Sequence, residues 1–307
     1  MEEQKRLDEA HGDHWQMVMD PQDFLAEHLQ SVVNTAKLWR RGRASVSVDE
    51  EGTPQDDTEV VLMQHDQGCG VSVVIPLARP PKGDAWSLMS FYPVPHGIPM
   101  YVTVTEVYPW SNGLEAYVTC ELSDERVLTF FAADYGVRTD LYLPGHRILI
   151  EYAALGTALQ KPEKDSVVYE GESANDMRSK FGQEPEFGPD GSPAPMVISL
   201  KHLTAYIGAY DSDPSLYQFQ SPVLSEGGRV FKPAGSFYGE DLVSCQLYLE
   251  YDSDYPGKGP FLPLYAKREG LPDLSPGDPL MGLIWLVCTA SDSSRSPVRS
   301  CRRSPCR

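Results

Sequence analysis

LTFFAADY (residues 128–135) is an apolar run that leads through a Pro-Gly pair (144–145) into a second apolar run, ILI (148–150). The same order returns later in the chain as FLPLYA (261–266), PGD (276–278) and LMGLIWL (280–286). An internal repeat of this kind predicts two copies of one small β unit. The repeat bounds the architecture, but it names no reaction.

Length and charge set the class of protein. The 307 residues are enough for about two domains of ~150 residues each. A hydrophobic content of 41% with 10% aromatic residues is enough for ordinary cores. The formal net charge of −18 predicts an acidic surface that repels phosphate backbones and anionic lipid. Nucleic acid is therefore an unfavoured partner, and no membrane partner is expected.

The chain lacks the sequence signals of export. No window approaches the ~20 apolar residues that span a bilayer. The first nine residues, MEEQKRLDE, are charged and lead into no apolar segment, unlike a secretory signal. We therefore expect a cytoplasmic protein.

Cysteine spacing and acidic clusters offer no convincing metal site. The six cysteines form no Cys-x-x-Cys pair, and Cys120 and Cys245 lie in alternating strand patterns that predict reduced core residues. His11-Gly12-Asp13-His14 holds two imidazoles and a carboxylate, but residues 1–19 are polar, so we expect these histidines to be solvated. Asp211-Ser212-Asp213 and Asp252-Ser253-Asp254 lack the rest of a calcium loop and are expected to be solvated turns. No metal and no cofactor is predicted.

An amphipathic helix is predicted over residues 21–39. Asp20-Pro21 supplies a capping carboxylate and a proline suited to the first helical position. Arg40-Arg41-Gly42 suits a helix end. An acidic loop follows over residues 49–59. The predicted apolar face consists of Leu25, Leu29, Val32, Val33 and Ala36.

Period-two alternation predicts strands through most of the rest. The first two cover residues 60–63 and 71–75, whereas the proline-dense residues 76–99 indicate a connection or an edge. Residues 153–159 are either a strand end or a short helix. The other predicted strands cover residues 100–105, 115–122, 127–131, 147–152, 197–200, 203–207, 217–223, 243–251, 261–266 and 280–286.

These patterns predict a mainly β fold, α+β overall, with two OB-like antiparallel barrels behind an N-terminal amphipathic helix. The apolar strand that enters its successor through a Pro-Gly or Gly-Asp turn resembles the OB fold in tandem, and the overall pattern is similar to bacterial proteins without assigned activity. The predicted units are an N-terminal helical arm with its acidic loop (1–58), a first OB-like domain (59–160), a linker (161–195), a second OB-like domain (196–288) and a disordered Arg/Ser tail (289–307).

The tail departs from the composition of everything before it. It carries five arginines and one aspartate, hence a formal +4, and it lacks the apolar spacing of a core. Two interpretations stay open. The segment either binds acidic partners or accepts phosphate, or it arises from a reading-frame change that replaced further strands.

Motifs for catalysis are missing from the sequence. It contains no Gly-x-Ser-x-Gly elbow, no phosphate-binding glycine loop and no Cys-His arrangement of a recognisable kind. His146 and His202 can join carboxylates only in three dimensions, so an enzyme with such a site remains one alternative. The sequence favours a chain that is not an enzyme.

Aromatic residues are the remaining functional signal, because Tyr and Trp are enriched in binding hot spots. Tyr108 and Trp110, which flank Pro109 at a turn, are the strongest candidates for exposure. The main hypothesis is a non-enzymatic protein-binding or assembly module, and the alternative is single-stranded nucleic-acid binding through aromatic strand faces. The candidate binding residues are Tyr108, Trp110, Tyr135, Tyr217, Phe219, Tyr248 and Tyr265.

Overall fold

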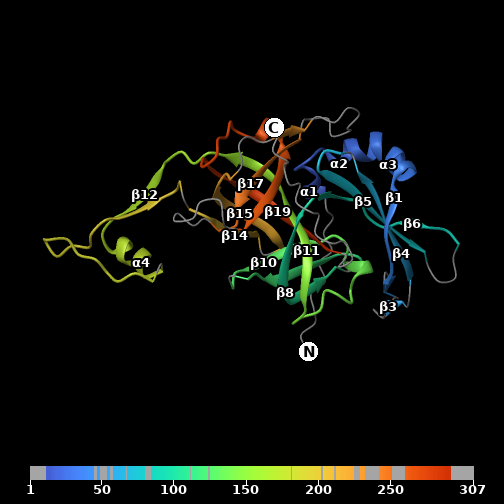
Figure 1. Cartoon of the computed structure of the whole chain (residues 1–307), viewed down its shortest axis with the longest axis horizontal. Helices are drawn as coiled ribbons and strands as arrows, with labels where there is room; N and C mark the ends of the chain where they lie inside the picture. The colour runs from blue at the N-terminus through green and yellow to red at the C-terminus, as the bar shows by residue number, and fades with distance from the viewer. Residues whose placement is uncertain are drawn as a thin grey trace, which may run out of the picture.

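The computed structural model has a mostly β architecture with a closed β-barrel, which confirms the predicted mainly β class. Figure 1 shows a blue N-terminal sheet beside a central barrel region, and a yellow arm that projects away from both. The structure describes residues 12–44, 47–48, 54–55, 58–66, 68–79, 84–110, 112–123, 125–180, 182–201, 203–210, 212–224, 229–231, 242–250 and 260–291.

Four short helical segments open the described chain: α1 (Gly12–Trp15), α2 (Pro21–Asp23), the π-helical η1 (Phe24–His28) and α3 (Leu29–Thr35). The Asp20 carboxylate caps α2 as predicted, since it accepts a hydrogen bond of 2.7 Å from the backbone N–H of Gln22. The predicted end at residue 39 is wrong, because Ala36 is extended and strand β1 (Lys37–Ala44) follows it. No described helix has the length and apolar character needed to cross a bilayer.

The buried face of this helical stretch differs from the predicted one. Of the predicted apolar residues, Val32 is buried and Leu29 packs against the same core, but Leu25 and Val33 are exposed. Phe24, which was not predicted, is buried. The π-helical turn explains the difference, because its wider turn shifts the phase of the side chains that follow it. Phe24 stacks on Trp15 with ring centroids 4.4 Å apart, so α1 and η1 share one apolar contact.

The N-terminal sheet consists of β1, β4 (Thr58–Asp66), β5 (Val71–Arg79), β6 (Ser87–Leu88) and β7 (Tyr92–Pro95). Strands β2 (Ser47–Val48) and β3 (Pro54–Gln55) form a separate pair. Both predicted strands are present. The expectation of no regular central strand from residue 76 onward is wrong for residues 76–79, because β5 continues to residue 79, whereas β6 and β7 fit the predicted edge. On one side of β5, β7 pairs with residues 71–74 and β6 pairs with residues 77–78. Pro76 is tolerated because it lies between these two pairings, where no ladder N–H donation to β6 or β7 is needed.

Five strands close the barrel: β8 (Ile98–Pro109), β9 (Ala116–Glu121), β10 (Val127–Ala132), β11 (Arg147–Gln160) and β19 (Pro279–Ala290). Their order around the ring is β8, β9, β10, β19, β11 and back to β8, and only the β10–β19 pair is parallel. Short helices η2 (Tyr135–Val137) and η3 (Arg268–Gly270) follow β10 and β18. The residues left ambiguous at 153–159 continue β11 as strand.

A second ring uses the other halves of β11 and β19. Its further strands are β15 (Asp213–Pro222), β17 (Leu242–Tyr248) and β18 (Phe261–Lys267), while β14 (Ala205–Tyr210) and β16 (Arg229–Phe231) lie at the two edges of the sheet. Strand β15 pairs with β19, β18 pairs with β11, and a bridge between Val223 and Leu247 joins the end of β15 to β17. Thr289 and Ala290, predicted as tail, belong to β19, and residues 292–307 lie outside the described residues.

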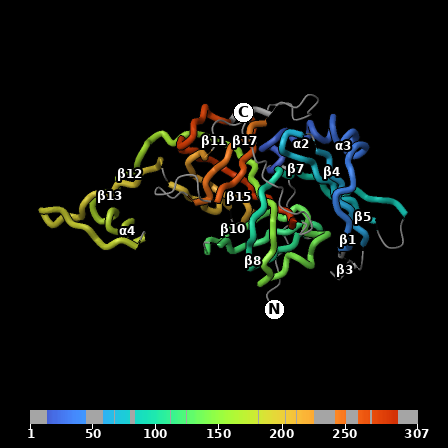
Figure 2. Tube along the Cα trace, viewed as in Figure 1, coloured from blue at the N-terminus to red at the C-terminus, as the bar shows by residue number. Residues whose placement is uncertain are grey.

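An ordered arm occupies the predicted linker. Residues 161–200, with residue 181 outside the description, contain β12 (Ser166–Tyr169), helix α4 (Glu172–Lys180) and β13 (Met196–Ser199). Strands β12 and β13 pair antiparallel as a two-stranded ribbon. Figure 2 shows the arm leaving the barrels next to β11 and returning toward β15.

Alternation along β19 separates two hydrophobic cores. Leu280, Ile284 and Leu286 face the core inside the rings, whereas Trp285 and Val287 face a second core shared with the N-terminal sheet. Strand β11 divides in the same way, because Ala154 lies in the first core and Leu155 in the second. Four free cysteines are buried in the described part of the chain, which includes the predicted core residues: Cys69, Cys120, Cys245 and Cys288.

Replacing Leu286 with alanine removes a fully buried side chain from the interior core, and we expect the free energy of unfolding to fall by about 2–5 kcal/mol. Leu283→Ala is the matched control, because Leu283 lies on the same strand and is half-buried. It should cost about 1 kcal/mol. Guanidinium chloride unfolding curves measure both losses, and equal losses would contradict the assignment of Leu286 to the core.

Candidate functional site

Most of the aromatic residues proposed for binding are parts of the framework. Tyr108 is exposed, with 41% of its surface accessible. The predicted exposure of Trp110 is wrong, because its ring is buried against Tyr117 and Phe131 at centroid distances of 5.6 and 6.4 Å. Tyr135 and Tyr265 are half-buried. The remaining three are buried: Tyr217, Phe219 and Tyr248.

Hydrogen bonds show why these rings are held inside. The Tyr217 hydroxyl accepts the backbone N–H of Thr129 at 2.7 Å, which links β15 to β10. The Tyr265 hydroxyl donates to the carbonyl of His96 at 3.1 Å. Burial raises the pKa of both tyrosines, so both hydroxyls stay protonated near neutral pH. These candidates join strands and form no stacking platform on the described strands.

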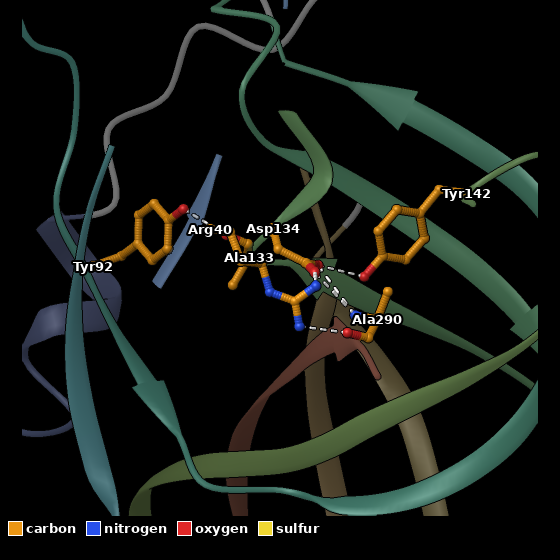
Figure 3. A network of polar contacts seen from close by, with 6 residues as sticks. All are labelled: Arg40, Tyr92, Ala133, Asp134, Tyr142 and Ala290. Carbon is orange, nitrogen blue, oxygen red and sulfur yellow. Dashed lines mark hydrogen bonds and ion pairs between the residues drawn. The ribbon is translucent and has the colours of Figure 1, made fainter. Parts of the chain in front are cut away.

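A buried ion pair joins the N-terminal sheet to the barrel (Figure 3). Arg40 on β1 places Nη1 2.7 Å from Oδ2 of Asp134, which follows β10 and is fully buried. Arg40 Nη2 also donates to the carbonyl of Ala290 at the end of β19. The Tyr142 hydroxyl donates to Asp134 Oδ1 at 2.6 Å, and the Ala290 N–H donates to both carboxylate oxygens at 3.2 Å.

The electrostatics of this network identify it as structural. Loss of hydration raises the pKa of the Asp134 carboxyl, while Arg40, Tyr142 and the Ala290 N–H act in the opposite direction. The neighbouring carbonyl of Ala133 accepts a bond of 2.7 Å from the Tyr92 hydroxyl, so a second strand of the N-terminal sheet is tied to the same turn. Both Asp134 oxygens are occupied by groups of the chain itself. The network therefore fixes the docking of two sheets.

A second buried polar cluster involves residues that the sequence predicted to be solvated, and that prediction is wrong for His14 and Asp213. His14 Nε2 lies 2.5 Å from Asp213 Oδ2, and the imidazole stacks on Trp285 at a centroid distance of 4.2 Å. The Ser215 hydroxyl donates to Asp213 Oδ1 at 2.8 Å and accepts from Trp285 Nε1 at 3.0 Å. The cluster holds α1 against β15 and β19.

These residue types suggest a nucleophile, a base and an acid, but the bonding differs from a catalytic triad. A triad needs the serine hydroxyl bonded to the histidine. Here the Ser215 hydroxyl donates to Asp213 Oδ1, and His14 Nε2 contacts Asp213 Oδ2. Both side chains therefore bond to the carboxylate. The geometry therefore suits an anchor for the N-terminal segment. Sequence patterns marked both segments separately but could not join them, because His14 and Asp213 are 199 positions apart.

A cavity of about 270 Å³ lies between the N-terminal segment, the bulge of β11 and the end of β18. Its titratable lining residues are Lys267 and Glu269, and neither side chain is buried. Among the described residues, no group of three His, Cys, Asp or Glu side chains is placed to hold a metal ion. The cavity is lined by Gln16, Met17, Gly156, Thr157, Ala158, Leu159, Ala266, Lys267 and Glu269.

The arm (residues 161–200) is organised around a buried arginine rather than an apolar core. Arg178 of α4 donates to the carbonyls of Ala194 and Pro195 at 2.7 and 3.0 Å, and to Glu186 Oε2 at 3.0 Å. Its side chain is almost completely buried by these partners. One cation therefore fixes the helix against the chain that returns to β13.

The described residues of the arm expose three large apolar side chains. Val168 and Val197 are directly paired across β12 and β13, and they are 53% and 62% exposed. Phe187 is exposed on the same arm. The sequence prediction placed residues 161–195 in a linker because they are rich in Gly, Pro and acidic residues. It assigned the strand at 197–200 to the second OB-like domain, which is wrong, because β13 pairs with β12 in the arm. The short β-prone runs SVVY and MVIS were the available signals.

The base of the arm is fixed to the second ring. Lys161 forms an ion pair of 2.7 Å with Asp278, and Lys201 forms one of 3.0 Å with Asp165. Gln220 of β15 donates to the carbonyl of Leu200 at 2.7 Å. The Lys161–Asp278 and Gln220–Leu200 contacts therefore join the base of the arm to the second ring, whereas the Lys201–Asp165 pair lies within that base.

Comparison of this chain with protein-family models, with curated protein sequences and with solved structures finds no match.

Removing Arg40 leaves the Asp134 carboxylate buried without its counter-ion. We expect Arg40→Ala to lower the free energy of unfolding by about 3–5 kcal/mol. Arg41→Ala is the control on the same strand, because the Arg41 side chain is mostly exposed, and it should cost less than about 1 kcal/mol. Urea unfolding measures both values. A loss at Arg40 no larger than that at Arg41 would refute the role of the ion pair.

The His14–Asp213 contact predicts a dependence of stability on acid. Burial alone would raise the pKa of Asp213, but the bonds from His14 and Ser215 outweigh it, so this pKa lies below its ordinary value of 3.8. A lowered pKa contributes stability above the unfolded-state value, and that contribution is lost as pH falls through the folded-state value.

We therefore expect Asp213→Asn to be less stable than the wild type at pH 6, with the difference shrinking as pH falls below about 4. Asp140→Asn, at an exposed aspartate, is the control and should leave the difference near zero throughout. Unfolding free energies from pH 3 to 6 provide the measurement. A difference for Asp213→Asn that does not change with pH would disprove this assignment.

Proposed function

We propose that this chain is a non-enzymatic protein-binding module in which two interlocked OB-like units carry the arm as a docking element. The order of strands around the closed ring supports the OB-like interpretation, because a five-stranded Greek-key barrel defines that fold. The second ring repeats the order with β15, β17 and β18 as its first three strands. In each ring the third strand pairs parallel with the long strand supplied by the other unit.

The exposed Val168–Val197 pair carries the proposal. A two-stranded ribbon is marginally stable alone, and in the arm no further strand of the described chain pairs with it. Two valines on its open face lower the solubility of the chain and contribute little to its folding. Residues 168–210 also hold five of the fifteen exposed large apolar side chains of the described chain: Val168, Phe187, Val197, Ile207 and Tyr210. The directly paired Val168 and Val197 form the contiguous part of this set, and contiguous exposed apolar surface marks interaction sites.

Other properties fit the same proposal. Burial of most candidate aromatics weakens the case for nucleic-acid stacking, which needs rings with an open face. The four free, buried cysteines of the described chain suit a reducing compartment, so the proposal includes a cytoplasmic location. The resemblance to bacterial proteins also stays part of the proposal. Tyr108 remains a secondary contact candidate because its ring is exposed.

The double variant Val168→Asp/Val197→Asp tests the docking role. The full chain is immobilised and exposed to an extract of the cells that produce it, and retained proteins are quantified by mass spectrometry. We expect a partner retained by the wild type to be reduced at least tenfold by the double variant, because charge at the centre of the contact opposes burial.

Val127→Asp is the matched control, since Val127 is 55% exposed at the start of β10 and lies outside the arm. It should retain the partner at the wild-type level. Circular dichroism establishes that all variants are folded. Absence of any retained partner, or equal retention by the double variant and the wild type, would overturn the proposal.

A further inference from the structure

We propose that strand β14 binds an extended, basic segment of a partner protein by adding it as a further strand to the sheet. This inference rests on the proposed protein-binding function and names the mode of binding and the chemistry of the partner. It depends on the free edge of β14, on the side chains along that edge and on the charge around it.

The free edge comes from the sheet topology. Strand β14 is the first strand of the ten-stranded sheet, and β15 is its sole partner among the described strands. The pairing is regular from Ala205 to Gly208, and an irregularity occurs only between Gly208 and Tyr210. In a strand with one neighbour, alternate N–H and C=O groups point away from that neighbour. Among the described residues, no strand pairs with this row of backbone donors and acceptors, which makes it the proposed place where another chain adds.

The side chains do not protect this edge. Proteins usually block exposed edges with charged residues, prolines or bulges. The sequence of β14 is AYIGAY, without charge or proline, and Ile207 and Tyr210 are 64% and 58% exposed. The one irregularity lies at the end of the strand, so it leaves the first four residues straight. Such an edge has the properties of a template for strand addition.

The strand is ordered before any partner binds. The Tyr206 hydroxyl donates to the carbonyl of Tyr248 at 2.6 Å, and its ring stacks on Phe219 with centroids 6.3 Å apart. Tyr206 therefore anchors β14 on the inner side while Ile207 faces outward. A preordered edge reduces the conformational entropy that binding would otherwise cost.

Charge selects the chemistry of the incoming segment. The chain carries a net charge of −18, and the arm that precedes β14 in the sequence contains eight acidic and four basic residues, a net −4. A second copy of the chain would bring equal negative charge to the edge, whereas a basic segment is attracted at separations within the Debye length of ~8 Å. Alternation of side chains in a strand then predicts a basic residue at every second position with apolar residues between them.

The experiment uses the full-length chain and a synthetic ten-residue peptide that alternates lysine with valine or isoleucine. Fluorescence anisotropy is expected to show saturable binding that weakens with added salt. A peptide with glutamate in place of lysine should bind at least tenfold more weakly. N-methylation of alternate residues should abolish binding in one frame and leave it within threefold in the other, because only one set of N–H groups faces β14.

Protein variants locate the site. Ile207→Ser/Tyr210→Ser should weaken peptide binding at least fivefold, and Val127→Ser should leave it unchanged. Hydrogen exchange should slow within residues 205–210 when the peptide is added. Equal binding of the two peptides, or equal effects of both N-methylation frames, would overturn the inference.

Two further outcomes separate this inference from the proposed function. The cellular partner could be lost with Val168→Asp/Val197→Asp but retained with Ile207→Ser/Tyr210→Ser. That result would support the proposed function of the arm and overturn strand addition at β14. If the chain alone dimerises with rising concentration and Ile207→Ser prevents it, the occupant of the edge is a second copy and the inference is wrong. Analytical ultracentrifugation supplies that measurement.

Discussion

The antiparallel ribbon of β11 and β19 is the constraint on which the rest of the structure depends. Each strand is longer than one ring requires, and each continues from the first ring into the second. The two strands pair with each other from Ile150 to Gln160 on β11. Neither ring can close without both strands, so residues more than 100 positions apart must pair before either core is complete. Pairing over such separations carries a large loop-closure entropy and predicts slow, cooperative folding of the two rings together.

The two buried polar clusters complement this ribbon at its outer face. Trp285 and Val287 cover that face with apolar area, which is not directional. The Arg40–Asp134 pair and the His14–Asp213 contact are directional, because their hydrogen bonds form only in a narrow range of geometries. They therefore fix the position of the N-terminal segment. The first cluster bonds to Ala290 at one end of the ribbon, and the second contacts Trp285 near its middle. Hydrophobic burial thus brings the layers together, and charged hydrogen bonds fix their register.

Periodicity in the sequence predicted most strands, because alternation directly reflects a strand with one dry face. The repeated apolar runs also marked the two long strands correctly, yet nothing local in Ile148–Ile150 or Leu280–Leu286 indicates that each completes the other ring. Partner choice is a tertiary property. The same limit applies to His14 and Asp213, whose polar neighbours predict solvation. The arm was missed for a different reason: Arg178 replaces the apolar pattern that sequence analysis detects, and the valines that form its surface point away from any core.

An interlocked framework also restricts where binding can evolve. A substitution inside either ring disturbs strands that both rings share, so the ring interiors have little freedom to change. The arm and β14 lie outside this constraint, since the arm has its own centre at Arg178 and β14 adds to the sheet at its edge. Changes there alter the surface without affecting the β11–β19 ribbon. This separation between a rigid, shared core and an independently organised projection is why the exposed apolar side chains of residues 168–210 are more informative about function than the aromatic residues of the barrels.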